Sequence, residues 1–209
     1  MVPKHEIRNI IFDLGEVIID VNPQRTLDAF SKFGGEKLNE IYADAAHNGI
    51  FHDFECGRVD ADVFFKSLLK KLNIHTESSF YENAWNAMLG IIPAERVLLL
   101  KRLKQRYRTF LLSNTNHVHM ASINRYFSET YGEPSLKDFF EKEYYSYKVG
   151  FRKPDAAIFS LVLNENNLLP RETLFLDDVD ENLAGAARLG IKTLKVSREK
   201  GIIELLNGY

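Results

Sequence analysis

The fold of this chain is decided first at residues 7–15, which read IRNIIFDLG. The apolar run at residues 10–12 is short, and it stops at a polar turn that begins with Asp13. A short apolar run bounded by a turn is typical of a buried β-strand. The segment therefore predicts a first strand inside a sheet, with an aspartate placed just beyond its carboxyl end.

Alternating strand and helix patterns continue in the second half of the chain. Short apolar runs predict further strands at residues 109–112, 144–147, 173–176 and 192–196. Helical spacing predicts helices at residues 94–106, 155–166 and 181–189. Because strands separated by helices indicate a parallel sheet covered on both faces, we expect an α/β fold. Its core is predicted to be a Rossmann-like, doubly wound, mostly parallel five-stranded sheet.

Residues 21–90 follow a different pattern from the rest of the chain. Apolar residues three and four positions apart predict helices at residues 25–33, 60–72 and 79–89. Few runs in this block resemble strands. Because the block separates the first strand from the second, we expect an inserted all-helical cap. The predicted division is a core made of residues 1–20 and 91–209, with a cap at residues 21–90.

Composition excludes several other classes of protein. Of 209 residues, 45% are hydrophobic and 27% are charged, a balance typical of a globular domain. The net charge of -2 gives no reason to expect nucleic acid as a partner, and the sequence indicates no oligomeric state. No apolar run approaches the roughly 20 residues of a spanning helix, and no long apolar leader is present, so we expect no membrane partner. The single cysteine, Cys56, excludes an internal disulfide and favours a cytoplasmic location.

Polar side chains gather where the predicted strands end. In chain order they are Asp13, Ser113, Asn114, Lys153, Asp177 and Asp178. Each of them alone has a structural interpretation, as a turn residue, a helix cap or an acid at a helix N-terminus. Ligands of open α/β sheets bind outside the carboxyl ends of the strands, so their joint placement predicts a single site.

The chemistry of these side chains is that of phosphoryl transfer. Clustered carboxylates repel one another, and Mg²⁺, which prefers oxygen ligands, relieves that repulsion. A hydroxyl and a lysine are suited to holding a phosphate, and an aspartate beside the metal can attack phosphorus to form an aspartyl-phosphate. We therefore expect Mg²⁺ as the cofactor and a small-molecule phosphate ester as the partner.

Several motifs occur in a fixed order along nearly the whole chain. They are IIFDLGEVI at residues 10–18, LLSNTN at 111–116, GFRKPD at 150–155 and LFLDDVDENLAGAARLGI at 174–191. Together they resemble the haloacid dehalogenase-like superfamily, in its phosphatase branch with a helical cap. The stretch FHDFECGR at residues 51–58 also resembles the E-x-G cap loop of this branch. The resemblance implies a phosphoric monoester hydrolase.

The resemblance assigns catalytic and metal-binding roles to matched positions. It implies that Asp13 is the nucleophile and a metal ligand, and that the backbone carbonyl of Gly15 also faces the metal. It implies that Asp178 binds the metal directly, with Asp177 beside it, either direct or through water. Lys153 is implied to stabilise the charge of the nucleophile and of the phosphate.

The resemblance also assigns substrate contacts. It implies that Ser113 and Asn114, together with Lys153, hold the phosphate. Glu55, in the E-x-G loop, is the candidate contact from the cap to the rest of the substrate. Asn182 is implied to orient the acidic loop rather than to touch substrate.

One position departs from the family pattern. Most phosphatases of this superfamily carry a second aspartate, the general acid and base, two residues after the nucleophile, and here that residue is Gly15. Its loss matters least when the leaving group is good, so a sugar 1-phosphate is one substrate that fits. Glu16 either takes part in catalysis or faces the cap or solvent. Two alternatives stay open: a metal-independent 2-haloacid dehalogenase using Asp13, and a non-catalytic phosphate-binding protein.

Overall fold

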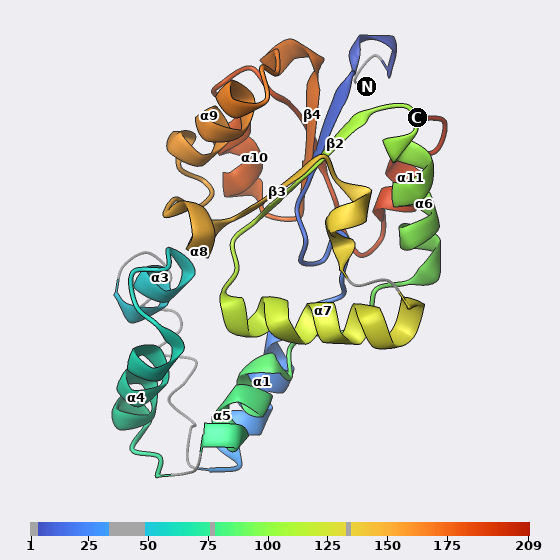
Figure 1. The fold of residues 1–209 in the computed structure, drawn as a ribbon. Coiled ribbons are helices and arrows are strands. Elements are labelled where there is room, and N and C mark those ends of the chain that lie inside the picture. Colours follow the sequence, from blue (N-terminus) through green and yellow to red (C-terminus); the bar gives the residue numbers. More distant parts are fainter. Residues whose placement is uncertain (1–3, 34–48, 76–77, 133–134) are drawn as a thin grey trace.

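A computed structural model describes residues 4–33, 49–75, 78–132 and 135–209 (Figure 1). Within these residues the strands of the sheet are β1 (Asn9–Phe12), β2 (Arg108–Ser113), β3 (Lys142–Tyr145), β4 (Thr173–Asp177) and β5 (Lys192–Lys195). Their spatial order is β3-β2-β1-β4-β5, and every neighbouring pair is parallel. The predicted doubly wound α/β fold is confirmed, with a fully parallel sheet where a mostly parallel one is expected.

Helices cover both faces of this sheet (Figure 1). One face carries α9 (Ala156–Glu165) and α10 (Asp180–Ala187), and the other carries α6 (Ala94–Lys104), α7 (His117–Tyr131) and α11 (Ile202–Leu205). Shorter turns are η1 (Lys4–Glu6), η2 (Leu136–Phe139), α8 (Ser146–Val149) and η3 (Pro170–Glu172). Among the described helices, none combines the length and the apolar character that a membrane-spanning segment needs.

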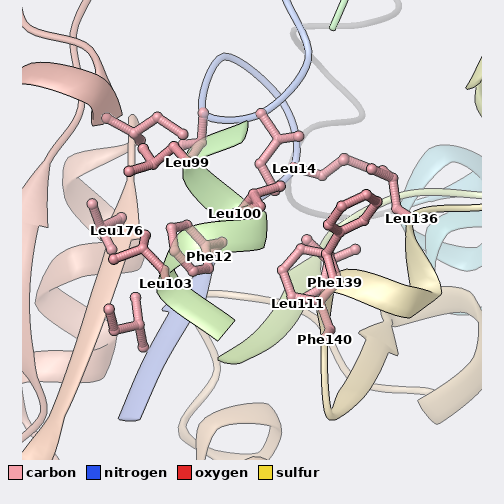
Figure 2. Packing of buried hydrophobic residues seen from close by; sticks show 14 of the residues in the cluster. Phe12, Leu14, Leu99, Leu100, Leu103, Leu111, Leu136, Phe139, Phe140 and Leu176 are labelled. Carbon is pink, nitrogen blue, oxygen red and sulfur yellow. The ribbon is translucent and has the colours of Figure 1, made fainter. Parts of the chain in front are cut away.

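Alternation along β1 places its side chains in both cores. Ile11 packs with the α9 and α10 side, whereas Ile10 and Phe12 pack with the α6 side. Figure 2 shows Phe12 of β1 and Leu176 of β4 close to Leu103 of α6. Each such side chain contributes about 1.5–3 kcal/mol when it is fully buried. This packing fixes the end of β1, and with it the position of the aspartate that follows.

The described helices between residues 21 and 90 lie apart from the sheet (Figure 1). They are α1 (Pro23–Ser31), α3 (Ile50–Glu55), α4 (Ala61–Leu72) and α5 (Ser78–Asn86). They share an apolar cluster in which Phe54 stacks on Phe64, with 4.1 Å between ring centroids. The chain leaves the sheet for these helices near Asp20 and returns near Ile91. The two segments run side by side, since the Asp20 N–H donates to the Ile91 carbonyl. The division into a core and a cap at residues 20 and 90 stays a prediction.

Two parts of the structure differ from the sequence-based expectation. The predicted strand at residues 144–147 is wrong in position, because β3 is Lys142–Tyr145 and α8 begins at Ser146. As an edge strand, β3 tolerates the polar Lys142 and Glu143, which hide its start from an apolar pattern. The sequence-based expectation also omits α7, although its buried residues Met120, Ile123 and Phe127 follow helical spacing. Its start is marked by Asn116, whose side chain accepts the His119 N–H at 3.0 Å.

Candidate active site

Lys153 lies at the centre of a buried cluster of charges. Its Nζ is 2.6 Å from a carboxylate oxygen of Asp13 and 2.6 Å from one of Asp177. The lysine is 1% exposed and Asp177 is fully buried. Burial lowers the pKa of Lys153, but the charges of Asp13 and Asp177 outweigh burial and hold the pKa above its ordinary value. The lysine is therefore charged, and each of the three groups depends on the other two.

Loops at one edge of the sheet bring these residues together. Asp13 follows β1, and its N–H donates to the Leu176 carbonyl of β4 at 2.9 Å. Asp177 is the last residue of β4. The Lys153 backbone is held by Asn114, beyond the end of β2: its N–H donates to Asn114 Oδ1, and Asn114 Nδ2 donates to its carbonyl, both at 2.8 Å. The carboxyl ends of parallel strands thus build the site, as the sequence predicts.

Asp177 and Asp178 have different surroundings although they are adjacent. A carboxylate has about four lone-pair sites. For Asp177 these are taken by Lys153, by the Val179 N–H at 2.8 Å, and by Asn182 Nδ2, which donates to the two oxygens at 3.0 and 3.1 Å. Asp178 is only half-buried and lines a cavity, and burial followed by the charge of Asp177 raises its pKa. Asp178 is therefore better placed than Asp177 for direct contact with a metal.

The acidic cluster fits a divalent cation. Asp13, Asp177 and Asp178 each present an oxygen within 4.8 Å of the other two. Burial raises the pKa of Asp13 to about 7, and the charge of Asp177 adds to this effect, while Lys153 opposes it. One lysine does not neutralise three carboxylates, so a hard cation with oxygen ligands relieves the remaining repulsion. This donor set suits Mg²⁺, which uses one or two carboxylates and keeps waters or phosphate oxygens.

A cavity of about 640 Å³ opens in front of the cluster. Of the predicted site residues, its wall includes Asp13, Gly15, Ser113, Asn114, Lys153 and Asp178. Glu55 is not among the residues that line it. The Glu55 carboxylate lies 3.1 Å from Nη2 of Arg152 and so joins α3 to the core, and burial raises the pKa of Glu55 despite that guanidinium. The predicted contact of Glu55 with substrate stays a prediction.

The cavity wall also includes charged or titratable residues that were not predicted as site residues: His52, Arg152, Asp155 and Glu181. His52 lies on α3 one helical turn before Glu55, and residues three apart share a helix face, so the spacing offered a signal. The E-x-G loop also comes close to the core at Gly57, which has φ of +67°. A Cβ at this position would lie 2.1 Å from the Tyr147 carbonyl oxygen, so glycine permits the approach.

Glu16 lines the same cavity, but its carboxylate is held by the chain around it. Oε1 accepts the Val21 N–H at 2.7 Å, and Oε2 lies 3.7 Å from Nε of Arg198. Glu16 has φ of 55°, a left-handed conformation that is unfavourable for residues other than glycine. These contacts favour a role in holding the turn after Asp13 over a role in proton transfer.

The fold and the acidic site define a hydrolase class, and comparison with known proteins gives the family. Residues 7–190 match the family model of the haloacid dehalogenase-like hydrolases. The chain belongs to this family. D-ribitol-5-phosphate phosphatase from Bacteroides thetaiotaomicron is 32% identical over 190 residues, which are 90% of this chain and 91% of the relative.

Solved structures agree with this assignment. A crystal structure of a haloacid dehalogenase family enzyme from Bacteroides thetaiotaomicron, in complex with magnesium and inorganic phosphate, has a TM-score of 0.87 and 31% identity. The match covers 96% of this chain and 99% of the chain in the crystal structure. A predicted hydrolase of the family from Porphyromonas gingivalis has the same TM-score at 32% identity, over 97% of each chain. The family and its named relative confirm the prediction of a phosphoric monoester hydrolase, and the magnesium in the crystal structure of the family enzyme supports the predicted cofactor.

Proposed function

We propose that the protein is a Mg²⁺-dependent phosphatase that acts on a small sugar or polyol phosphate through an aspartyl-phosphate on Asp13. The observation that carries the proposal is the placement of Asp13, Lys153 and Asp178 on one cavity wall, with Lys153 Nζ 2.6 Å from Asp13. The substrate class is supported by the 32% identical relative, which is named a D-ribitol-5-phosphate phosphatase. A sugar 1-phosphate, expected from Gly15, is one member of this class.

The side chains divide the reaction between them. A carboxylate oxygen of Asp13 attacks phosphorus, the bond to the substrate oxygen breaks, and the leaving oxygen takes a proton from water to depart as the alcohol, because position 15 carries no acid. Lys153 stabilises the negative charge that develops on the phosphate oxygens, and Ser113 donates its hydroxyl to one of them. Asp13 and Asp178 would hold Mg²⁺, which would neutralise part of the phosphate charge when bound. Water then hydrolyses the aspartyl-phosphate, which releases inorganic phosphate and restores Asp13.

Other predicted site residues act through Lys153 in this proposal. Asp177 holds the ammonium group of the lysine, and Asn182 holds Asp177. Asn114 fixes the lysine backbone from both sides, so its side chain positions the lysine instead of binding phosphate. The cytoplasmic location expected from the single cysteine stays a prediction.

A screen for phosphate release tests the proposed function. Sugar phosphates, polyol phosphates, nucleotides and acyl phosphates are incubated with the protein, with Mg²⁺ or with excess EDTA. We expect phosphate release from a sugar or polyol phosphate with Mg²⁺, and a loss of about a hundredfold or more in EDTA, because the carboxylates are then left without their cation. Chloride release from a 2-haloacid in EDTA would support the dehalogenase alternative. Binding of a phosphosugar without phosphate release would support the non-catalytic alternative.

Restoring the missing aspartate tests the interpretation of Gly15. A Cβ at this position would meet only Val21 Cγ2, at 3.4 Å, so a side chain fits beside the nucleophile. We expect Gly15→Asp to raise turnover of an alkyl phosphate by about tenfold or more over Gly15→Asn, since only the acid can protonate the leaving oxygen. With p-nitrophenyl phosphate, whose leaving group is good, the two variants should differ little. Equal rates of the two variants on the alkyl ester would show that position 15 supplies no acid.

A further inference from the structure

The helices between residues 21 and 90 reach the cavity through α3. Among the described residues of this block, Val21, Pro23 and His52 line the cavity, and His52 is the titratable one. α3 lies against α8, which precedes the lysine loop of the site (Figure 1). The His52 side chain is only 20% exposed, so its neighbours hold it in place on the cavity wall.

The neighbours of His52 determine which ring nitrogen donates a hydrogen bond. Nη1 of Arg58 lies 3.4 Å from Nδ1 of His52, and it also donates to Asp53 at 3.2 Å. Because a guanidinium only donates, a hydrogen bond from Arg58 makes Nδ1 the acceptor and leaves Nε2 as the donor. Nε2 is 3.9 Å from Sγ of Cys56, which is a weak acceptor. An oxygen atom of a ligand in the cavity is therefore a better partner for this N–H.

The cavity wall around the reacting phosphate carries further negative charge. Asp155 and Glu181, both exposed, line it at the starts of α9 and α10. The basic residue Arg152 on the same wall lies 3.1 Å from Glu55, and Lys153 is paired with the aspartates of the site. A second anionic group on a substrate would meet this negative wall, whereas neutral hydroxyl groups would not be repelled.

We propose that His52 and the acidic wall select the leaving group of the substrate. Nε2–H of His52 donates to a neutral hydroxyl of the leaving group, while Asp155 and Glu181 disfavour a second anionic group. This inference rests on the proposed phosphatase function and deepens it. It favours neutral sugar and polyol phosphates over phosphorylated carboxylic acids and bisphosphates, and it makes His52 a specificity-determining residue.

Kinetics with two esters test the role of His52. D-ribitol 5-phosphate carries hydroxyl groups, and p-nitrophenyl phosphate carries none. We expect His52→Ala to lower kcat/KM for D-ribitol 5-phosphate about five- to tenfold, mainly through KM, and to leave p-nitrophenyl phosphate within about twofold. His52→Gln, whose amide can still donate, should retain most of the activity on the polyol ester. His75→Ala, which changes an exposed histidine outside the cavity wall, is the matched control and should alter neither substrate.

The outcomes separate this inference from the proposed function. If the wild-type protein releases phosphate from neither ester nor from any ester of the screen, the phosphatase function itself is wrong. If both esters are hydrolysed and His52→Ala slows them equally, or slows neither, His52 does not bind the hydroxyl groups of the leaving group. A loss with D-ribitol 5-phosphate alone supports the inference.

A charge comparison tests the acidic wall. We expect the kcat/KM of the wild-type protein to be about tenfold or more higher for D-ribitol 5-phosphate than for 3-phosphoglycerate at low ionic strength. The double variant Asp155→Asn with Glu181→Gln should narrow this ratio about threefold, and added salt should weaken the effect because exposed charges are screened. Asp62→Asn removes an exposed carboxylate outside the cavity wall and should leave the ratio unchanged. A wild-type preference for 3-phosphoglycerate, or an unchanged ratio in the double variant, would overturn the proposed role of the wall.

Discussion

Asp13→Asn is expected to reduce phosphate release by at least about a thousandfold while the chain stays folded. The amide oxygen of asparagine is a poor nucleophile, so the aspartyl-phosphate does not form. The variant also removes one of the negative charges that hold the cation. The fold survives because asparagine has the same shape, and because Lys153 keeps Asp177 at 2.6 Å. The bond from the backbone N–H of residue 13 to the Leu176 carbonyl does not depend on the side chain.

Two measurements together check this expectation. Phosphate release is followed with a sugar or polyol phosphate and with p-nitrophenyl phosphate, and thermal unfolding is followed with and without Mg²⁺. We expect Mg²⁺ to raise the melting temperature of the wild-type protein more than that of Asp13→Asn, since a ligand stabilises the state that binds it. The control is Asp180→Asn, whose carboxylate is 81% exposed and which should keep activity within about twofold. Hydrolysis of p-nitrophenyl phosphate by Asp13→Asn at the wild-type rate would exclude the proposed nucleophile.

The central strands could be predicted because their environment is uniform. β1 and β4 are buried on both faces, so their sequences are short apolar runs that stop at an aspartate. The edge strand β3 begins with Lys142 and Glu143, and its polar start carries no such signal. The helix α7 was missed although it carries a signal, since Asn116 caps it and Met120, Ile123 and Phe127 lie at helical spacing.

The convergence of the site could be predicted because it follows from topology. Parallel strands end at one edge, so a polar residue after each strand lies near the others. The different states of Asp177 and Asp178 could not be predicted, because they depend on which donors reach each oxygen. The N–H of Val179 and the amide of Asn182 reach Asp177 alone, and only folded geometry shows this. The spacing of His52 from Glu55 gave a partial signal, but its place on the cavity wall depends on how α3 packs against α8.

Lys153→Met is expected to lower the free energy of unfolding by about 3–5 kcal/mol and to abolish phosphate release. Methionine fills the space of the lysine chain up to Cε but carries no ammonium group and no charge. The substitution removes the ammonium group that lies 2.6 Å from an oxygen of Asp177. The fully buried Asp177 carboxylate is then left without a positive partner. Asp13 loses the same partner, so the remaining carboxylates repel each other across the site. Urea unfolding measures the stability change, and a phosphate-release assay measures the activity.

The double variant Lys153→Met with Asp177→Asn separates charge balance from chemistry. Asparagine at position 177 removes the buried charge that methionine leaves unpaired, so the double variant should be more stable than the sum of the two single variants predicts. We expect a coupling energy of about 1–3 kcal/mol, as is found for residues in one ion-pair network. Activity should stay absent in the double variant, because restored neutrality does not replace the ammonium group beside the phosphate. Additive losses of stability would mean that Lys153 and Asp177 are not coupled. Recovery of phosphate release without Lys153 would mean that the lysine only maintains the fold.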